Sequence, residues 1–263
     1  MAQTEKRPRN QCFAALTFRN VSVSARHDHL LGANDFVDFL IRHITAADGF
    51  QFPAYHATPT DARRGGLVVL HAIWGVTPHI RALCDEYAAD GYEVIAPSLA
   101  DRVDPRWPEV DIDPEHLPVR EAWANSVGWG DGCMGDVQAA IDTLAPRGSV
   151  FVMGFCFGGT TTWLAACRLE GVAAAACFYR GQIVLYRDET PKVPTILHFG
   201  KADPLIPLAD REAITAAHPD IPAYLYDAGH AFVAPNAYHA DSARLARLRT
   251  LQLFARGKGR GEA

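Results

Sequence analysis

The stretch Ser149–Gly159, SVFVMGFCFGG, constrains the fold of this chain more than any other. The apolar, β-prone run Val150–Met153 predicts a buried strand, and Thr160–Leu169 predict a helix that follows almost at once. Cys156 stands at the turn between them, with glycines two positions to either side. A Cβ atom at either glycine would strike the neighbouring strand or helix, so the turn is tight and strained. The stretch therefore predicts an α/β protein with a thiol at the turn that ends a strand.

A reactive side chain on such a strand–turn–helix unit resembles the nucleophile elbow of the α/β-hydrolases. The usual nucleophile of that elbow is Ser, and Cys156 takes its place in this chain. The pattern G-x-C-x-G is short, however, and a cysteine is often only a small buried hydrophobic residue. A catalytic interpretation of Cys156 therefore needs partners elsewhere in the sequence.

Two further residues follow Cys156 in the order nucleophile, acid, histidine that this fold requires. Asp203 comes after the β-prone run Pro194–Phe199, at the sheet edge where α/β proteins build their sites. His230 leaves the short strand pattern Ala223–Tyr226 through a glycine. Each has an ordinary alternative, because Asp203 precedes a proline and can simply open a turn, and His230 is one of eleven histidines.

Together the three residues make chemical sense. A free thiol has a pKa of about 8.5, and its thiolate form is the nucleophile. The helix that begins behind Cys156 stabilises negative charge on sulfur, and an imidazolium at His230 would do so further. Asp203 would fix the orientation of that ring, and the backbone N–H of Phe157 is one natural donor to an oxyanion.

Three motifs in this order are similar to those of the dienelactone hydrolase family: GFCFGG, KADPLIP and AGHAF. A fourth block agrees, LVVLHAIWGV at Leu67–Val76, followed by an apparent helix and then GYEVIAP at Gly91–Pro97. The resemblance covers about Ile44 to Ala255. It implies an α/β-hydrolase domain that opens enol-lactones, with carboxymethylenebutenolide as the named substrate.

The resemblance also assigns roles to individual residues. It implies that Cys156, Asp203 and His230 form the catalytic triad, and that the backbone N–H of Ile73 is the second oxyanion donor. The family has a Glu that takes part in generating the thiolate, and here that position is Ala72. The neighbouring His71 is a poor replacement, because successive residues of a strand point to opposite faces.

A second departure concerns the charge of the substrate. Members of the family hold a substrate carboxylate with arginines, one of them four residues beyond the histidine, where this chain has Ala234. Arg180 follows an apolar run at the same sheet edge, and Arg120 falls near the other family arginine after a small gap. Either guanidinium could bind a carboxylate through its planar fork, and the alternative for each is a solvated surface arginine.

Aromatic residues flank these motifs. Trp74, Tyr179 and Phe232 are predicted to line an apolar substrate pocket, and the alternative for each is ordinary core packing. The long segment Ser98–Gly132 contains Trp107, Trp123 and Trp129 and is predicted to be irregular structure over the site.

The predicted architecture is a mostly parallel sheet with helices on both faces. The predicted core strands are Leu67–His71, Glu93–Ala96, Val150–Gly154, Ala173–Tyr179, Thr195–Phe199 and Ala223–Tyr226. The predicted helices are Pro78–Asp90, Gly135–Leu144, Thr160–Leu169, Ala209–Ala217 and Asp241–Phe254.

Composition is that of one globular unit, with 49% hydrophobic and 21% charged residues in 263. The net charge of −5 gives no reason to expect nucleic acid or an anionic membrane surface as a partner. No apolar run approaches the roughly 20 residues that span a bilayer. We expect a small-molecule ester or lactone as the partner, with a monomer or small homo-oligomer as the assembly.

The six cysteines show no C-x-x-C pair and no metal-ligand spacing, so we expect neither a metal nor a cofactor. The polar N-terminus has no apolar signal region, and a reducing cytoplasm would suit a working thiolate. We expect three parts: an N-terminal extension over residues 1–43, partly disordered or the product of a misplaced start; the α/β-hydrolase domain, 44–258; and a flexible tail, 259–263.

The leading hypothesis is a cysteine-dependent hydrolase that acts through a thioester. One alternative, favoured by Ala72 and the missing arginine, is a ligand-binding protein of the same fold with weak or no catalysis. The other is a thiol redox sensor or peroxidase, although that function would not explain Asp203 and His230.

Overall fold

The computed structural model describes residues 41–103 and 113–257. The expected N-terminal extension lies outside the described residues except for 41–43, and the expected tail, 259–263, lies wholly outside them. Trp107, one of the three tryptophans assigned to the segment over the site, lies outside them as well.

The described strands form a single eight-stranded sheet in the order β1-β2-β4-β3-β5-β6-β7-β8. The pairings of β2 with β1 and β4 are antiparallel, and those among the other strands are parallel. The strands are β1 Ile41–Thr45, β2 Gln51–Ala57, β3 Gly65–Leu70, β4 Tyr92–Pro97, β5 Val150–Phe155, β6 Val172–Phe178, β7 Thr195–Gly200 and β8 Ala223–Tyr226.

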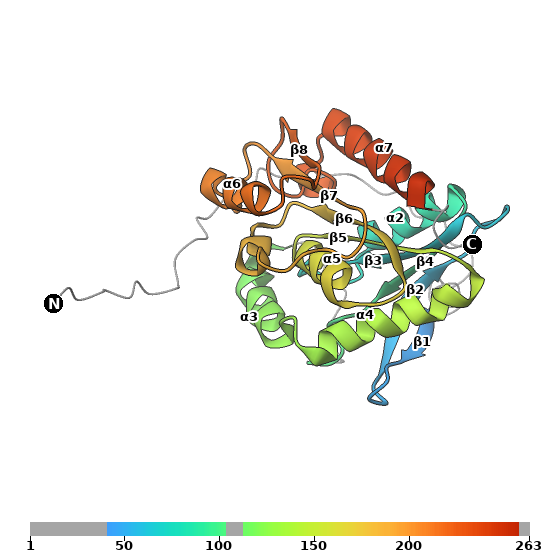
Figure 1. The fold of residues 1–263 in the computed structure, drawn as a ribbon. Coiled ribbons are helices and arrows are strands. Elements are labelled where there is room, and N and C mark those ends of the chain that lie inside the picture. Colours follow the sequence, from blue (N-terminus) through green and yellow to red (C-terminus); the bar gives the residue numbers. More distant parts are fainter. Residues whose placement is uncertain (1–40, 104–112, 258–263) are drawn as a thin grey trace, which may run out of the picture.

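Helices cover both faces of the sheet (Figure 1). The α-helices are α2 Pro78–Ala89, α3 Leu117–Val127, α4 Asp131–Leu144, α5 Phe157–Arg168, α6 Leu208–Ala217 and α7 Ala240–Gly257. Short 3₁₀ turns lie at Pro114–His116, Ala145–Arg147, Gly181–Tyr186 and Pro235–Ala237. Tyr92 contacts Tyr87 of α2 and Phe254 of α7, so these two helices share one face, while α4 and α5 lie on the other (Figure 1).

The central strands of the sheet are buried on both faces. Every residue of β3, β4 and β5 is buried, as expected of strands with helices on both faces. The predicted mostly parallel sheet with helices on both faces is confirmed, and each predicted strand and helix is present with its ends shifted by at most four residues.

Two predictions about local structure were wrong or incomplete. The segment Ser98–Gly132 is not irregular throughout, because α3 occupies Leu117–Val127 and α4 begins at Asp131. Pro118 lies in the first turn of α3, where its missing N–H costs no hydrogen bond, so the proline does not exclude a helix. The hairpin β1–β2 was not among the predicted core strands, and its second strand contains Pro53.

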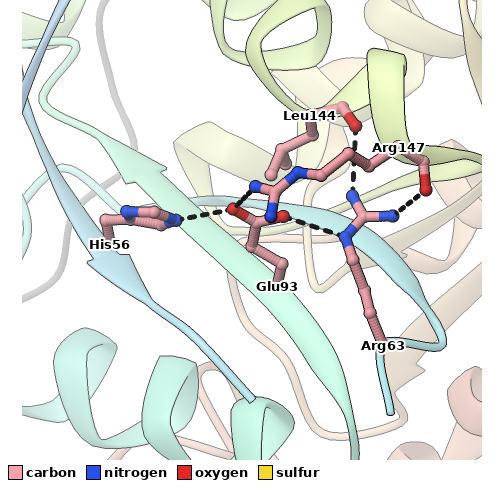
Figure 2. Close-up of polar contacts among 5 residues, drawn as sticks. All are labelled: His56, Arg63, Glu93, Leu144 and Arg147. Carbon is pink, nitrogen blue, oxygen red and sulfur yellow. Dashed lines mark hydrogen bonds and ion pairs between the residues drawn. The ribbon is translucent and has the colours of Figure 1, made fainter.

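A buried carboxylate lies near the amino end of β4, at the end of the sheet away from Cys156 (Figure 2). The side chain of Glu93 is only 1% exposed, and it accepts hydrogen bonds from His56 at 2.9 Å, Arg63 at 2.8 Å and Arg147. Arg63 also donates to the backbone carbonyls of Leu144 and Arg147 (Figure 2). Burial raises the pKa of Glu93, but these donors outweigh burial and hold the pKa below its ordinary value.

Among the described residues, no helix combines the length and the apolar character needed to cross a membrane.

Candidate active site

Cys156 occupies a strained turn between β5 and α5. Its backbone has φ 51° and ψ −115°, a region that residues with a side chain rarely adopt. A Cβ atom on Gly154 would come within 2.6 Å of the Thr162 hydroxyl on α5, and one on Gly158 within 2.7 Å of the carbonyl of His71 after β3. The close approaches predicted from the two glycines are therefore confirmed. Such strain at an otherwise well-packed position points to function.

Asp203 and His230 come from neighbouring loops at the same edge of the sheet. Asp203 follows β7 and His230 follows β8, and Nδ1 of His230 donates to Oδ2 of Asp203 over 2.8 Å. The backbone N–H of Leu205 donates to the other carboxylate oxygen at 2.9 Å. The two loops pack closely, since a Cβ atom on Gly200 would come within 2.5 Å of the Gly229 carbonyl. Asp203 thereby fixes the ring of His230 with its Nε2 available to the thiol.

The thiol of Cys156 has two cationic neighbours. His230 is hydrogen-bonded to it, and a terminal nitrogen of Arg180 donates to Sγ at 3.4 Å. Burial raises the pKa of Cys156, but the charge of Arg180 and the hydrogen bond from His230 outweigh burial and lower the pKa to about 6. Burial lowers the pKa of His230, but its bonds to Asp203 and Cys156 raise it to about 9. The two opposite shifts favour the thiolate–imidazolium form of the pair over the form with a neutral thiol and a neutral imidazole.

The other described cysteines behave differently. Cys84, Cys133, Cys167 and Cys177 are all buried, and burial raises the pKa of each above its ordinary value. Cys156 is buried to a similar extent, so burial does not explain its lowered pKa. Among the described cysteines, Cys156 alone has a pKa below its ordinary value, because cationic neighbours outweigh its burial.

The predicted oxyanion donors come from two segments: Phe157 directly follows Cys156 at the start of α5, and Ile73 lies in the loop after β3. The backbone N–H of Phe157 faces the sulfur, where it helps to lower the thiol pKa. Ile73 lies in the loop after β3, and this loop is fastened to the elbow by a 3.0 Å bond from Gly158 N–H to the His71 carbonyl. The ring of Trp123 contacts the rings of both Phe157, at 5.6 Å, and His71, at 6.0 Å. One tryptophan therefore supports both donor segments.

His71 does not replace the Glu that is absent at Ala72. Nδ1 of His71 donates to the Ala72 carbonyl at 2.6 Å, and Nε2 accepts from the N–H of Leu99 at 3.1 Å. Burial lowers the pKa of His71 to about 4, so the ring is neutral at ordinary pH. Its role is to join the loops that follow β3 and β4.

The remaining predicted site residues fall into two groups. Trp74 is half-buried in the loop after β3, and Arg120 lies beneath it at 5.7 Å from the ring centre with 1% of its surface exposed. Tyr179 and Phe232 are buried and in contact, with ring centres 5.3 Å apart. Tyr179 also contacts His230 at 5.2 Å, whereas the buried ring of Phe232 lies in the core behind it.

Glu121 was missed by the sequence analysis. It lies on α3, Oε1 is buried, and this oxygen has no hydrogen-bond partner among the described residues. Burial raises the pKa of Glu121, and the charge of Arg180 opposes the rise. Nothing in the sequence distinguishes this glutamate, because the helix that carries it was itself not predicted.

Within residues 41–103 and 113–257, no group of three or more His, Cys, Asp or Glu side chains is arranged to hold a metal ion.

Comparisons with known proteins agree with one another. The model of the dienelactone hydrolase family matches residues 52–257. The carboxymethylenebutenolidase of Pseudomonas sp. (strain P51) is 30% identical over 234 residues, which cover 82% of this chain and 94% of that protein. The carboxymethylenebutenolidase of Pseudomonas putida is 28% identical over 231 residues, with 81% and 94% covered.

Solved structures give the same result. A structure from Klebsiella pneumoniae that is assigned to the dienelactone hydrolases has a TM-score of 0.67 and 29% identity, and covers 82% of this chain and 98% of its own. An esterase from Pyrococcus furiosus, at 13% identity and a TM-score of 0.62, shares the fold.

Proposed function

The chain belongs to the dienelactone hydrolase family, and from this premise we propose that it opens lactone or activated ester substrates with Cys156 as nucleophile, through a thioester acyl-enzyme. Family membership makes it a hydrolase of ester bonds with an α/β-hydrolase fold, acting on a small molecule. The observation that carries the proposal is the environment of Sγ, which Arg180 and the Asp203–His230 pair hold as a thiolate.

In the acylation step, the thiolate attacks the ester carbonyl carbon, a C–S bond forms, and the carbonyl electrons move onto oxygen. The N–H groups of Phe157 and Ile73 are proposed to donate to this oxyanion. Collapse restores the C=O bond and breaks the C–O bond of the ring. The leaving alkoxide takes a proton from the imidazolium of His230, whereas a leaving enolate is stable enough to depart unprotonated.

Deacylation returns the enzyme to its starting state. After an alkoxide has left with the proton of His230, the neutral imidazole takes a proton from water as the water oxygen attacks the thioester carbonyl. After an enolate has departed unprotonated, His230 is still an imidazolium, and the enolate takes the proton from water instead. When the tetrahedral intermediate collapses, the C–S bond breaks and the electron pair returns to sulfur as thiolate. The imidazolium and thiolate are then restored, and the product leaves as a hydroxy acid or its keto tautomer.

The substrate class follows from the nucleophile and from the relatives. A thiolate is a better leaving group than an alkoxide, so a tetrahedral intermediate on Cys156 breaks forward only when the substrate oxygen leaves readily. Enol-lactones and activated esters meet that condition, and the named relatives are carboxymethylenebutenolidases. We propose that Trp74 and Arg180 contact the substrate. Arg120, Tyr179 and Phe232 were predicted to do so as well, but each is no more than 2% exposed, so we assign them a supporting role beneath Trp74 and behind the His230 loop.

The test is a set of enol-lactones, aliphatic lactones and p-nitrophenyl esters, assayed with the wild type and with Cys156→Ala. We expect turnover of enol-lactones and p-nitrophenyl esters, little on simple alkyl esters, and a loss of about 10³-fold or more in Cys156→Ala. Mass spectrometry of the wild type should detect an acyl group on the peptide that contains Cys156.

A matched control is Cys167→Ala, which removes from the other end of α5 a thiol whose pKa is raised by burial. It should retain full turnover. Undiminished ester turnover by Cys156→Ala would refute the nucleophile assignment, and wild type that binds lactones without turnover or acylation would support the ligand-binding alternative.

A further inference from the structure

Helix α3 brings to the site a carboxylate that the mechanism above does not use. Arg120 on this helix lies beneath Trp74, and Trp123 contacts Phe157, so α3 covers the loops that carry both proposed oxyanion donors. Glu121 lies between these two contacts in the helix. Its Oε1 atom is buried and, within the described part of the chain, accepts no hydrogen bond.

Arg180 presents the complementary group. One terminal nitrogen of its guanidinium donates to Sγ of Cys156, but Nε is buried and donates to no partner that the structure describes. The guanidinium charge acts on the Glu121 carboxyl group, so the two side chains are within electrostatic reach of each other. A buried donor beside the nucleophile and a buried acceptor on the covering helix, within reach of the charge of that donor, therefore both lack a partner among the described residues.

Leaving such groups unsatisfied is costly. Each buried polar group without a partner costs about 1–3 kcal/mol, and native structures retain few of them without a reason. A ligand that satisfies both must accept from Arg180 Nε and donate to Glu121 Oε1. A neutral hydroxyl group does both with one oxygen. A carboxylate can only accept and would face the charge of Glu121, and an ammonium group can only donate and would face the charge of Arg180.

We infer that Glu121 and Arg180 form a polar subsite beside Cys156 that binds a hydroxyl group of the substrate and disfavours a carboxylate at the same position. The inference rests on the proposed function and names its substrate class: neutral, hydroxyl-bearing lactones or activated esters.

The test compares two butenolides that differ only in one substituent, hydroxymethyl or carboxylate, through their kcat/KM values at pH 8. We expect the wild type to prefer the hydroxymethyl compound by about tenfold or more, which corresponds to one hydrogen bond or one repulsive charge pair. Glu121→Gln keeps the size of the side chain but removes its charge. It should lower the hydroxymethyl-to-carboxylate ratio by about tenfold, and Glu121→Asp should restore part of the preference.

The control is Glu115→Gln, an exposed glutamate in the turn before α3, which should leave the ratio at the wild-type value. A purely structural role for Glu121 would reduce both rates equally and leave the ratio unchanged, which would overturn the inference. A wild type that prefers the carboxylate compound would overturn it too. If the wild type turns over neither butenolide nor a p-nitrophenyl ester, the proposed function itself fails, so the two failures are distinguishable.

Discussion

The two ends of the parallel strands both bury ionised groups beside arginines, but they do so in opposite ways. At the amino end of β4, both carboxylate oxygens of Glu93 accept hydrogen bonds, and each nitrogen of the Arg63 guanidinium donates to Glu93 or to a backbone carbonyl (Figure 2). At the carboxyl end of β5, Arg180 contacts the thiol of Cys156, but its buried Nε donates to no group within residues 41–103 and 113–257. One end is saturated with hydrogen bonds and the other is not.

We infer from this difference that the hydrogen-bonded network at Glu93 contributes to stability and that the end at Cys156 serves the chemistry. A buried ionic network whose members are all satisfied ties its elements together, and Glu93 joins β2 and β4 to the segment between α4 and β5. A site with strain at Cys156 and unpaired polar atoms nearby stores free energy that a ligand can release. Substitutions at the two ends should therefore affect different measurements.

The largest expected effect is on activity at the carboxyl end. Asp203→Asn should lower kcat by about 10³–10⁴-fold, because an amide no longer holds His230 in the tautomer and charge state that the thiolate needs. The free energy of unfolding, measured by urea denaturation, should change by less than about 1 kcal/mol. An Asp203→Asn enzyme that keeps most of its kcat would show that His230 is oriented by some other group.

The second-largest expected effect is on stability, at the amino end of β4, with little change in activity. Glu93→Gln leaves Arg63 and Arg147 without their carboxylate and should lower the free energy of unfolding by about 3–5 kcal/mol. The folded fraction should keep kcat close to the wild-type value. The control is Glu170→Gln, which breaks the exposed ion pair with Lys192 and should cost no more than about 1 kcal/mol.

If Glu93→Gln and Glu170→Gln lower the free energy of unfolding by the same amount, the buried network at Glu93 stabilises the protein no more than an exposed ion pair does. If Glu93→Gln instead lowers kcat in the folded protein, the two ends are coupled and the contrast between them is wrong.

How far the sequence could predict these two ends also differs. The elbow was predictable because its chemistry is local: a strand, two glycines and a thiol within ten residues. The order Cys156, Asp203, His230 was predictable because each residue follows a recognisable strand. The network at Glu93 was not, since its donors come from positions 30 to 54 residues away in the chain and depend on tertiary packing.

The sequence also did not predict the contact of Arg180 with Sγ or the position of Glu121. Arg180 was expected to bind a substrate carboxylate, and nothing in its neighbours in the chain shows that the side chain reaches the sulfur. Glu121 became visible only once α3 had been placed over the site. Long-range side-chain pairing is the part of the site that sequence patterns do not encode.

A smaller effect tests what ionises the nucleophile. Arg180→Gln removes the guanidinium charge, which together with His230 lowers the pKa of Cys156 to about 6. The rate of alkylation by iodoacetamide should rise with pH around 6 in the wild type and around a higher pH in the variant, so that the rate at pH 7 falls by about tenfold or more. Arg180→Lys should restore part of the shift, whereas an unchanged profile in Arg180→Gln would leave His230 as the sole source of the thiolate.

The pH dependence of activity follows from the same pair. Catalysis needs the thiolate with its imidazolium partner, so kcat/KM should rise as pH passes the Cys156 pKa of about 6 and fall as it passes the His230 pKa of about 9. Stability has the matching signs. The depressed thiol pKa contributes stability that is lost as pH falls through about 6, and the raised imidazole pKa contributes stability that is lost as pH rises through about 9. A plateau that begins only near pH 8 would mean that Cys156 is protonated in the resting enzyme.

The smallest expected effect is at Ala72, where the family has a Glu. If that carboxylate served only to generate the thiolate, restoring it would raise activity in a chain that lacked another means. Here Arg180 and His230 already ionise Cys156, and a further negative charge nearby would raise the thiol pKa. Ala72→Glu should therefore change kcat/KM on lactones by less than about threefold and shift the alkylation profile to slightly higher pH. A gain in kcat/KM of about tenfold or more would show that Arg180 does not replace the missing glutamate. The unpaired polar atoms near Cys156 would then reflect a missing catalytic carboxylate and not an empty substrate position.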